Sequence, residues 1–174
     1  MSVLRDLRVL ARYGAWADAK LFEHLAPLPE DELTKVRGAG FGSILRTLNH
    51  TYVADLIWQA NLQGKAHGFT QRNTDVLPSF AQLRDDQAAI NAWYRDYTDA
   101  LDEAACREVV NFHFIGGQAA SLPRGDMLLH ISHHKSYHRG FVAQMLYGAA
   151  FDPPMKPPTM DLPVFLRDVP ESAR

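Results

Sequence analysis

The stretch LLHISHHKSYHRG, residues 128–140, decides the fold, because apolar residues recur in it at helical spacing and histidines fall among them. At about 100° of rotation per residue, His138 lies about 40° from His134, whereas His133 lies about 100° away. The apolar residues within roughly 80° of His134 are Met127, Ile131, Phe141, Val142 and Met145. We therefore expect His134 and His138 to point into a helical core and His133 into solvent.

Two inward histidines one helical turn apart can bind a single ion, because side chains at positions i and i+4 lie side by side. They can equally be core histidines whose ring nitrogens are hydrogen-bonded to Ser, Tyr or Asp. A third histidine from another helix would decide between these interpretations. His50 is the best candidate, because it lies within a long apolar helical pattern that starts after Ser43 and ends near Leu62.

Four long helical patterns follow one another along the chain. The first runs from about residue 3 to 25, and the second from the N-cap Ser43 to about residue 62. The third starts at the capping box Ser79-x-x-Gln82 and continues to about residue 101. The fourth begins between residues 121 and 126 and ends near Gly148. These patterns predict an all-α protein, a four-helix bundle. We expect this bundle to be a single domain that spans residues 1–174.

Two further segments depart from helical spacing. Val110, Phe112 and Phe114 alternate before the pair Gly116-Gly117, which predicts a short β-hairpin ahead of the last helix. Residues 152–158 are too rich in proline for a helix, so an extended C-terminal tail over the bundle is expected.

The composition excludes several classes of protein. The chain has 174 residues, a formal net charge of −2 and no run of Lys or Arg, which argues against a nucleic-acid partner. No apolar run approaches the roughly 18 residues of a membrane span, and Arg5, Asp6 and Arg8 interrupt any signal-peptide core. A cytoplasmic location without membrane association is expected. The single cysteine, Cys106, excludes an internal disulfide and thiolate-rich zinc sites.

The spacings also discriminate between metal chemistries. Paired Glu-x-x-His motifs of a di-iron bundle are absent, and Lys135 stands where a zinc peptidase needs its glutamate. A mononuclear site of neutral imidazoles with an open fourth position remains, and it suits Zn²⁺, Ni²⁺ or Fe²⁺. Such an ion lowers the pKa of a bound water or thiol. The chemistry expected is therefore that of a hydrolase or a thiol transferase.

The pattern His130-x-x-x-His134-x-x-Tyr137-His138-Arg139-Gly140 resembles the signature of the DinB/YfiT-like superfamily, a damage-inducible group of proposed metal-dependent enzymes. The segments YGAWAD (13–18), LNH (48–50) and 153–162 resemble its first-helix, second-helix and C-terminal motifs. The resemblance implies a four-helix bundle, a homodimer, and a metal ion held by His50, His134 and His138. Phe141 departs from the family, in which Gln commonly follows the Arg-Gly pair.

The superfamily includes proteins similar to bacillithiol S-transferases and to mycothiol-dependent isomerases, so a small-molecule substrate such as a low-molecular-weight thiol is implied. Tyr137, Asp55, Tyr52 and His130 are the candidates to support the ligands from outside the ion's coordination sphere. Two functional classes stay open: an enzyme, and a stress-response bundle in which the metal is structural or a small molecule is merely bound. A pocket at an open metal position would favour the enzyme, and a fourth protein ligand would favour the structural role. His24 and His113 are expected to lie outside the site, and His67 is expected to be a solvated loop residue that could reach a pocket at the end of the bundle.

Overall fold

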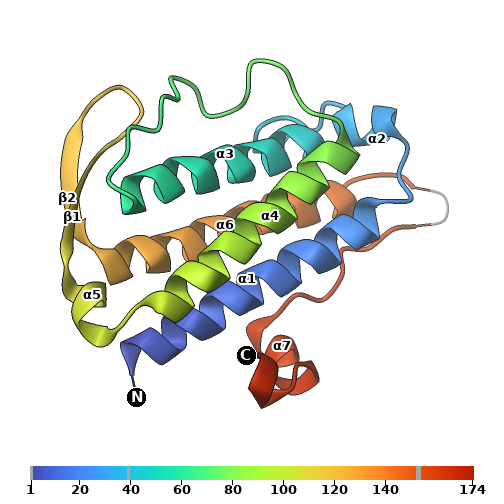
Figure 1. Cartoon of the computed structure of the whole chain (residues 1–174). Coiled ribbons are helices and arrows are strands. Elements are labelled where there is room, and N and C mark those ends of the chain that lie inside the picture. Colours follow the sequence, from blue (N-terminus) through green and yellow to red (C-terminus); the bar gives the residue numbers. More distant parts are fainter. Residues whose placement is uncertain (1, 39, 152–153) are drawn as a thin grey trace.

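The computed structural model describes residues 2–38, 40–151 and 154–174 of the chain. Its body is a bundle of four long helices that lie side by side (Figure 1). These helices are α1 (Val3–Leu25), α3 (Ile44–Leu62), α4 (Phe80–Ala100) and α6 (Arg124–Tyr147). The shorter elements are α2 (Glu30–Thr34), α5 (Glu103–Arg107), β1 (Val109–His113), β2 (Ala119–Pro123), α7 (Leu162–Asp168) and the 3₁₀ helix η1 (Glu171–Ala173). The predicted all-α bundle with a hairpin before its last long helix is confirmed.

The ends of the long helices follow from local hydrogen bonds. Ser43 and Ser79 both act as N-caps, because their hydroxyl oxygens accept from the backbone N–H groups of Arg46 and Gln82, each at 3.2 Å. The other half of the predicted capping box is not formed. The side-chain amide of Gln82 donates instead to Asp86 at 2.8 Å, one turn further along the helix.

The apolar core divides into two clusters, one toward each end of the bundle. The first includes Leu7, Trp58, Tyr94 and Met127. The second includes Leu21, Leu45, Leu83 and Met145. Both clusters take residues from all four long helices, so every helix buries one apolar face at each end. The middle of the bundle holds buried polar residues instead.

The hairpin closes one end of the bundle (Figure 1). Strands β1 and β2 pair antiparallel, with Val109 opposite Pro123 and His113 opposite Ala119. Gly116 and Gly117 have φ angles of 97° and 86°, a region that favours glycine, and the chain turns there as predicted. Phe112 packs its ring 5.1 Å from that of Trp58, which attaches the hairpin to the core.

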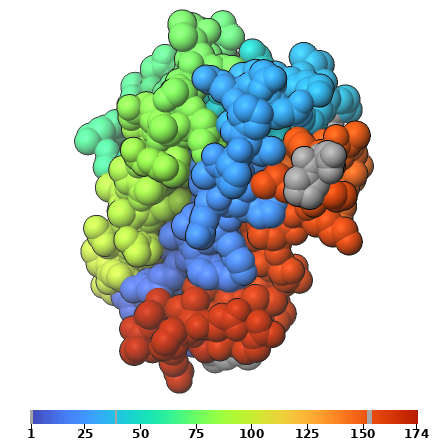
Figure 2. All heavy atoms as spheres, turned by 90° about the vertical axis from the view of Figure 1, so that its right-hand side faces the viewer, coloured from blue at the N-terminus to red at the C-terminus, as the bar shows by residue number. Residues whose placement is uncertain are grey.

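The C-terminal segment returns along the outside of the bundle to α7 and η1. Figure 2 shows this segment, in orange and red, against α1, in blue. Phe165 of α7 is buried against the rings of Tyr13 and Trp16, and the Tyr13 hydroxyl donates to the carbonyl of Met160 at 2.8 Å. Residues 154–158 are neither helix nor strand, as expected, whereas residues 152 and 153 of the predicted tail lie outside the described residues.

No helix in the described parts of the chain combines the length and the apolarity that crossing a membrane requires.

Candidate metal centre

Helices α3 and α6 bring three histidines together. His50 comes from the middle of α3, and His134 and His138 come from consecutive turns of α6. Their candidate ligand atoms all lie within 4.8 Å of one another, and the Nε2 atoms of His50 and His134 are 3.2 Å apart. His133 is exposed on the next face of α6, as its helical phase predicts.

The ring of His50 is held in one orientation from two sides. Its Nδ1 lies 2.8 Å from the carbonyl oxygen of Arg72. Because a carbonyl only accepts, Nδ1 carries the proton and donates, so Nε2 has a free lone pair on the side that faces His134. Phe41 stacks on the ring at a centroid distance of 3.9 Å and an interplanar angle of 23°. His50 is therefore fixed in the tautomer that a metal ligand at Nε2 requires.

All three imidazoles are neutral at pH 7. Burial lowers the pKa of His134 to about 3 and that of His138 to about 4, and the neighbouring histidines lower both further because like charges repel. Burial likewise lowers the pKa of His50. Neutral imidazole is the form that binds a metal ion, so protons do not compete with an ion at pH 7.

The residues present fit a divalent ion. Two nitrogens that each lie about 2.0–2.1 Å from a tetrahedral ion are about 3.3 Å apart, close to the 3.2 Å between His50 and His134. Within the described residues, His138 Nδ1 is buried and has no hydrogen-bond partner. A core histidine with a purely structural role normally has partners for its buried nitrogens. Among the described residues, no fourth His, Cys, Asp or Glu joins the group.

The three histidines form part of the wall of a cavity of about 640 Å³. His130 and Tyr137 line the same cavity. The ring of His130 packs 4.7 Å from Trp58 and 5.8 Å from His134, and Tyr137, which is 64% exposed, packs its ring edge-on 5.1 Å from His138. Two of the four proposed supporting residues therefore lie beside the histidines.

The side chains of Asp55 and Tyr52 lie on other faces of α3 than His50. Asp55 lies five positions after His50, which rotates it by about 140° around α3. Its carboxylate accepts instead from the ammonium of Lys135 and the amide of Gln87, both at 2.7 Å. Tyr52 is half-buried between the two apolar clusters. Helical phase within α3 was sufficient to separate both residues from His50.

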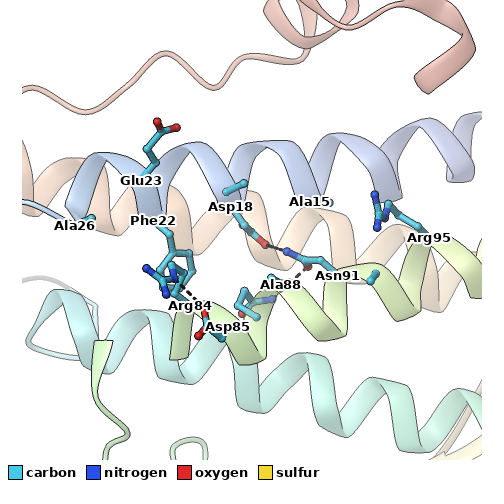
Figure 3. Close-up of a pocket in the computed structure, with 13 residues that line it drawn as sticks. Ala15, Asp18, Phe22, Glu23, Ala26, Arg84, Asp85, Ala88, Asn91 and Arg95 are labelled. Atoms are coloured by element: carbon cyan, nitrogen blue, oxygen red, sulfur yellow. Dashed lines mark hydrogen bonds and ion pairs between the residues drawn. The ribbon is translucent and has the colours of Figure 1, made fainter. Parts of the chain in front are cut away.

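A buried ionic network fills the middle of the bundle behind the histidines. Lys135 lies 2.8 Å from Asp18 and 2.7 Å from Asp55, and Arg139 lies 2.9 Å from the other oxygen of Asp18. Asn91 accepts from Lys135, and its amide donates to Asp18, a contact that Figure 3 shows. The sequence did not lead us to this network, although Asp18 and Gln87 stand at core-facing positions of their helical patterns.

The network keeps opposite charges together away from water. Burial opposes ionisation of Asp18, but the positive charges of Lys135 and Arg139 outweigh it and lower the pKa of the carboxyl. Burial also opposes the charge on Lys135, yet the two carboxylates raise its pKa. Burial raises the pKa of Asp55 against the attraction of Lys135. Charges from α1, α3 and α6 thus depend on one another, and the amides of Gln87 and Asn91 connect α4 to them.

A second cavity, of about 520 Å³, lies between α1 and α4 (Figure 3). It reaches the ionic network at Asp18, Gln87 and Asn91, and alanines form much of its remaining wall. The candidate metal ligands lie on α3 and α6 and do not line it. This cavity is therefore not part of the histidine site.

His24, His67 and His113 do not belong to the three-histidine group. His67 is in the loop after α3, where its Nδ1 accepts from the backbone of Phe69 at 3.0 Å. His24 is half-buried near the end of α1. His113 is exposed on β1 but lines the histidine cavity, a contact that the sequence did not predict.

A four-helix bundle that presents three converging histidines to a cavity is a candidate mononuclear metal protein. A comparison with protein families matches residues 1–165 to the family described as "DinB family". The chain belongs to this family. It is also similar to "Protein DinB" of Bacillus subtilis (strain 168), with 23% identity over 146 residues, which are 82% of this chain and 85% of that protein.

Proposed function

We propose that the protein is a metal-dependent enzyme whose single divalent ion is held by His50, His134 and His138. The observation that carries the proposal is the position of these histidines in the wall of a cavity of about 640 Å³. A structural zinc ion normally has four protein ligands, whereas a catalytic one has three and an accessible fourth position. The described residues supply three, which supports the enzymatic role over the structural one.

A divalent ion such as Zn²⁺, Ni²⁺ or Fe²⁺, when bound here, supplies Lewis acidity that lowers the pKa of a water or a thiol. The chain itself supplies neutral nitrogen donors, and the carbonyl of Arg72 fixes one of them. Aromatic rings, among them Phe41 and Trp58, line the cavity. Apolar walls of this kind exclude water and strengthen the interactions of charged groups at the site.

The reaction that we propose is hydrolysis of a small molecule or transfer of a low-molecular-weight thiol to one. The cavity volume falls within the roughly 300–1,000 Å³ of small-molecule sites. His130 and Tyr137 line the cavity beside the ligands, and we propose that they contact the substrate there. Both reaction types would use the same ion, and they differ in the nucleophile that it activates, which is water in hydrolysis and a thiol in thiol transfer.

The first experiment is metal analysis of protein purified without a polyhistidine tag. We expect about one divalent ion per chain in the wild type. Each of the variants His50→Ala, His134→Ala and His138→Ala should lose most of it, because each removes one of three ligands. His133→Ala is the matched control and should keep the ion, since His133 is exposed on another face of α6. Loss of the ion in His133→Ala with retention in His138→Ala would overturn the ligand assignment.

A further inference from the structure

The histidine cavity carries an unusual distribution of charge. Among the described residues that line it, Arg72 is the one with a permanent charge, and no Asp or Glu contributes to the wall. The Arg72 side chain has no ion-pair partner in the described parts of the chain, although the chain contains as many as 20 acidic residues. A guanidinium without a carboxylate partner at the wall of a cavity is free to bind an anion.

The backbone of Arg72 is fixed beside the candidate ligands. Its carbonyl accepts from His50, and the next residues, Asn73 and Thr74, both donate to the side-chain oxygen of Asn49 at 3.0 Å. The positive charge of Arg72 also lies close enough to His50 to contribute to its lowered pKa, after the larger effect of burial. Arg72, an exposed residue that lines the cavity, is therefore attached beside His50 to a loop that α3 holds in place.

The rest of the cavity wall is mainly apolar. Residues of α3 and of the hairpin face the same space from different elements, and they include Ile57, Trp58, Phe114 and Ile115. Asn61 adds a buried polar group to this part of the wall, at 4% exposure, and within the described residues no hydrogen bond to its side-chain amide is found. An apolar molecule with a polar substituent would satisfy both parts of this wall.

We propose that the cavity binds small organic anions, with an apolar body against Ile57, Trp58, Phe114 and Ile115 and an anionic oxygen group on Arg72. As a statement about the substrate, this rests on the proposed function, because the anion would be the molecule presented to the ion. As a statement about binding, it rests on the cavity wall alone. Arg72 is then a specificity-determining residue that selects anionic over neutral substrates.

The test is calorimetric titration of metal-free protein with 4-phenylbutanoate and with the neutral 4-phenylbutan-1-ol. The wild type should bind the carboxylate at least about tenfold more tightly, which is the effect of one charge-assisted hydrogen bond. Arg72→Gln should remove this preference, and Arg72→Lys should retain part of it. Arg95→Gln is the matched control, since Arg95 lines the other cavity, and it should bind both compounds as the wild type does.

The apolar contact is tested by Ile115→Ala in the hairpin, which should weaken binding of both compounds several-fold. Equal affinity for carboxylate and alcohol, or a preference that survives Arg72→Gln, would overturn the proposal. An unchanged affinity in Ile115→Ala would overturn the apolar part. The outcome is independent of the metal: a protein that binds no ion but shows the Arg72-dependent preference would contradict the proposed enzyme and uphold the anion site.

Discussion

Burial of the three imidazoles couples the stability of the metal-free protein to pH. Below their ordinary pKa of 6.5, these histidines are protonated in the unfolded chain. In the folded protein they stay neutral to lower pH, because burial lowers the pKa of His134 to about 3 and that of His138 to about 4. A folded-state pKa that is lowered in this way gives stability that is present above pH 6.5 and is lost as the pH falls toward 4 and 3.

We therefore expect the free energy of unfolding of the metal-free protein to fall between pH 7 and pH 5. In His134→Gln the fall should be shallower, because one of the groups that takes up a proton on unfolding is gone. Denaturant titrations of both proteins at pH 7, 6 and 5 measure the two slopes. His133→Gln should give the wild-type slope. Parallel slopes for the wild type and His134→Gln would contradict the pKa of about 3 assigned to His134.

At the scale of elements, α6 presents the candidate ligands on one face and Lys135 and Arg139 on the next. The cations of α6 pair with Asp18 of α1 and Asp55 of α3. One helix therefore carries both the histidines and the charges that connect it to its neighbours. The ionic network fixes the rotation of α6 about its axis and so places His134 and His138 opposite His50.

Removal of Lys135 should destabilise the fold strongly. Lys135→Met leaves two buried carboxylates without their shared cation, and we expect a loss of about 3–5 kcal/mol in the free energy of unfolding. Arg84→Met, which breaks the exposed pair with Asp85, is the control and should change the free energy of unfolding little, because water screens an exposed pair.

The double variant Asp55→Asn/Lys135→Met should lose less free energy of unfolding than its two single variants lose together. It removes the Asp55 carboxylate, which Lys135→Met alone leaves buried without its cation. Denaturant unfolding of all four members of this cycle gives the coupling energy. Strict additivity would show that Asp55 and Lys135 do not stabilise one another in the folded protein.

The periodicity of the sequence was sufficient to predict the long helices and the caps at Ser43 and Ser79. It was also sufficient to predict that His50 lies close to His134 and His138. It missed what depends on contacts between segments that are distant in sequence. The carbonyl of Arg72, which orients His50, belongs to a loop without any periodic pattern. In the sequence, Lys135 stands at the position that a glutamate occupies in a zinc-peptidase motif. Its ion-pair partners lie on α1 and α3, so the sequence of α6 alone does not predict them. The short helices α2, α5 and α7 were also not predicted.

At the scale of the whole molecule, the net charge of −2 predicts the absence of appreciable binding to DNA. Phosphate contacts from Lys and Arg supply most non-specific affinity, and this sequence has no run of them. Fluorescence anisotropy with a random DNA duplex in physiological salt should show no complex tighter than about 10⁻⁴ M. A micromolar complex that weakens with added salt would contradict this expectation. The homodimer and the cytoplasmic location implied by the sequence stay predictions.

The relation between cavity and histidines leads to the last prediction. If the histidine group holds an ion and its free side faces the cavity, a small thiol that enters from solvent can reach the ion. Protein loaded with Co²⁺ should therefore change its visible absorption when 2-mercaptoethanol is added, because charge transfer from a thiolate differs from that of nitrogen or oxygen ligands.

The matched control is His138→Ala, which should hold too little Co²⁺ to give the signal. Wild-type protein titrated with ethanol in place of the thiol should also leave the spectrum unchanged. A Co²⁺ spectrum that thiols do not alter, together with a fourth protein ligand on the ion, would assign the metal a structural role. A thiol-dependent band that disappears in His138→Ala would instead place an exchangeable position on the cavity side of the three histidines, as the enzymatic proposal requires.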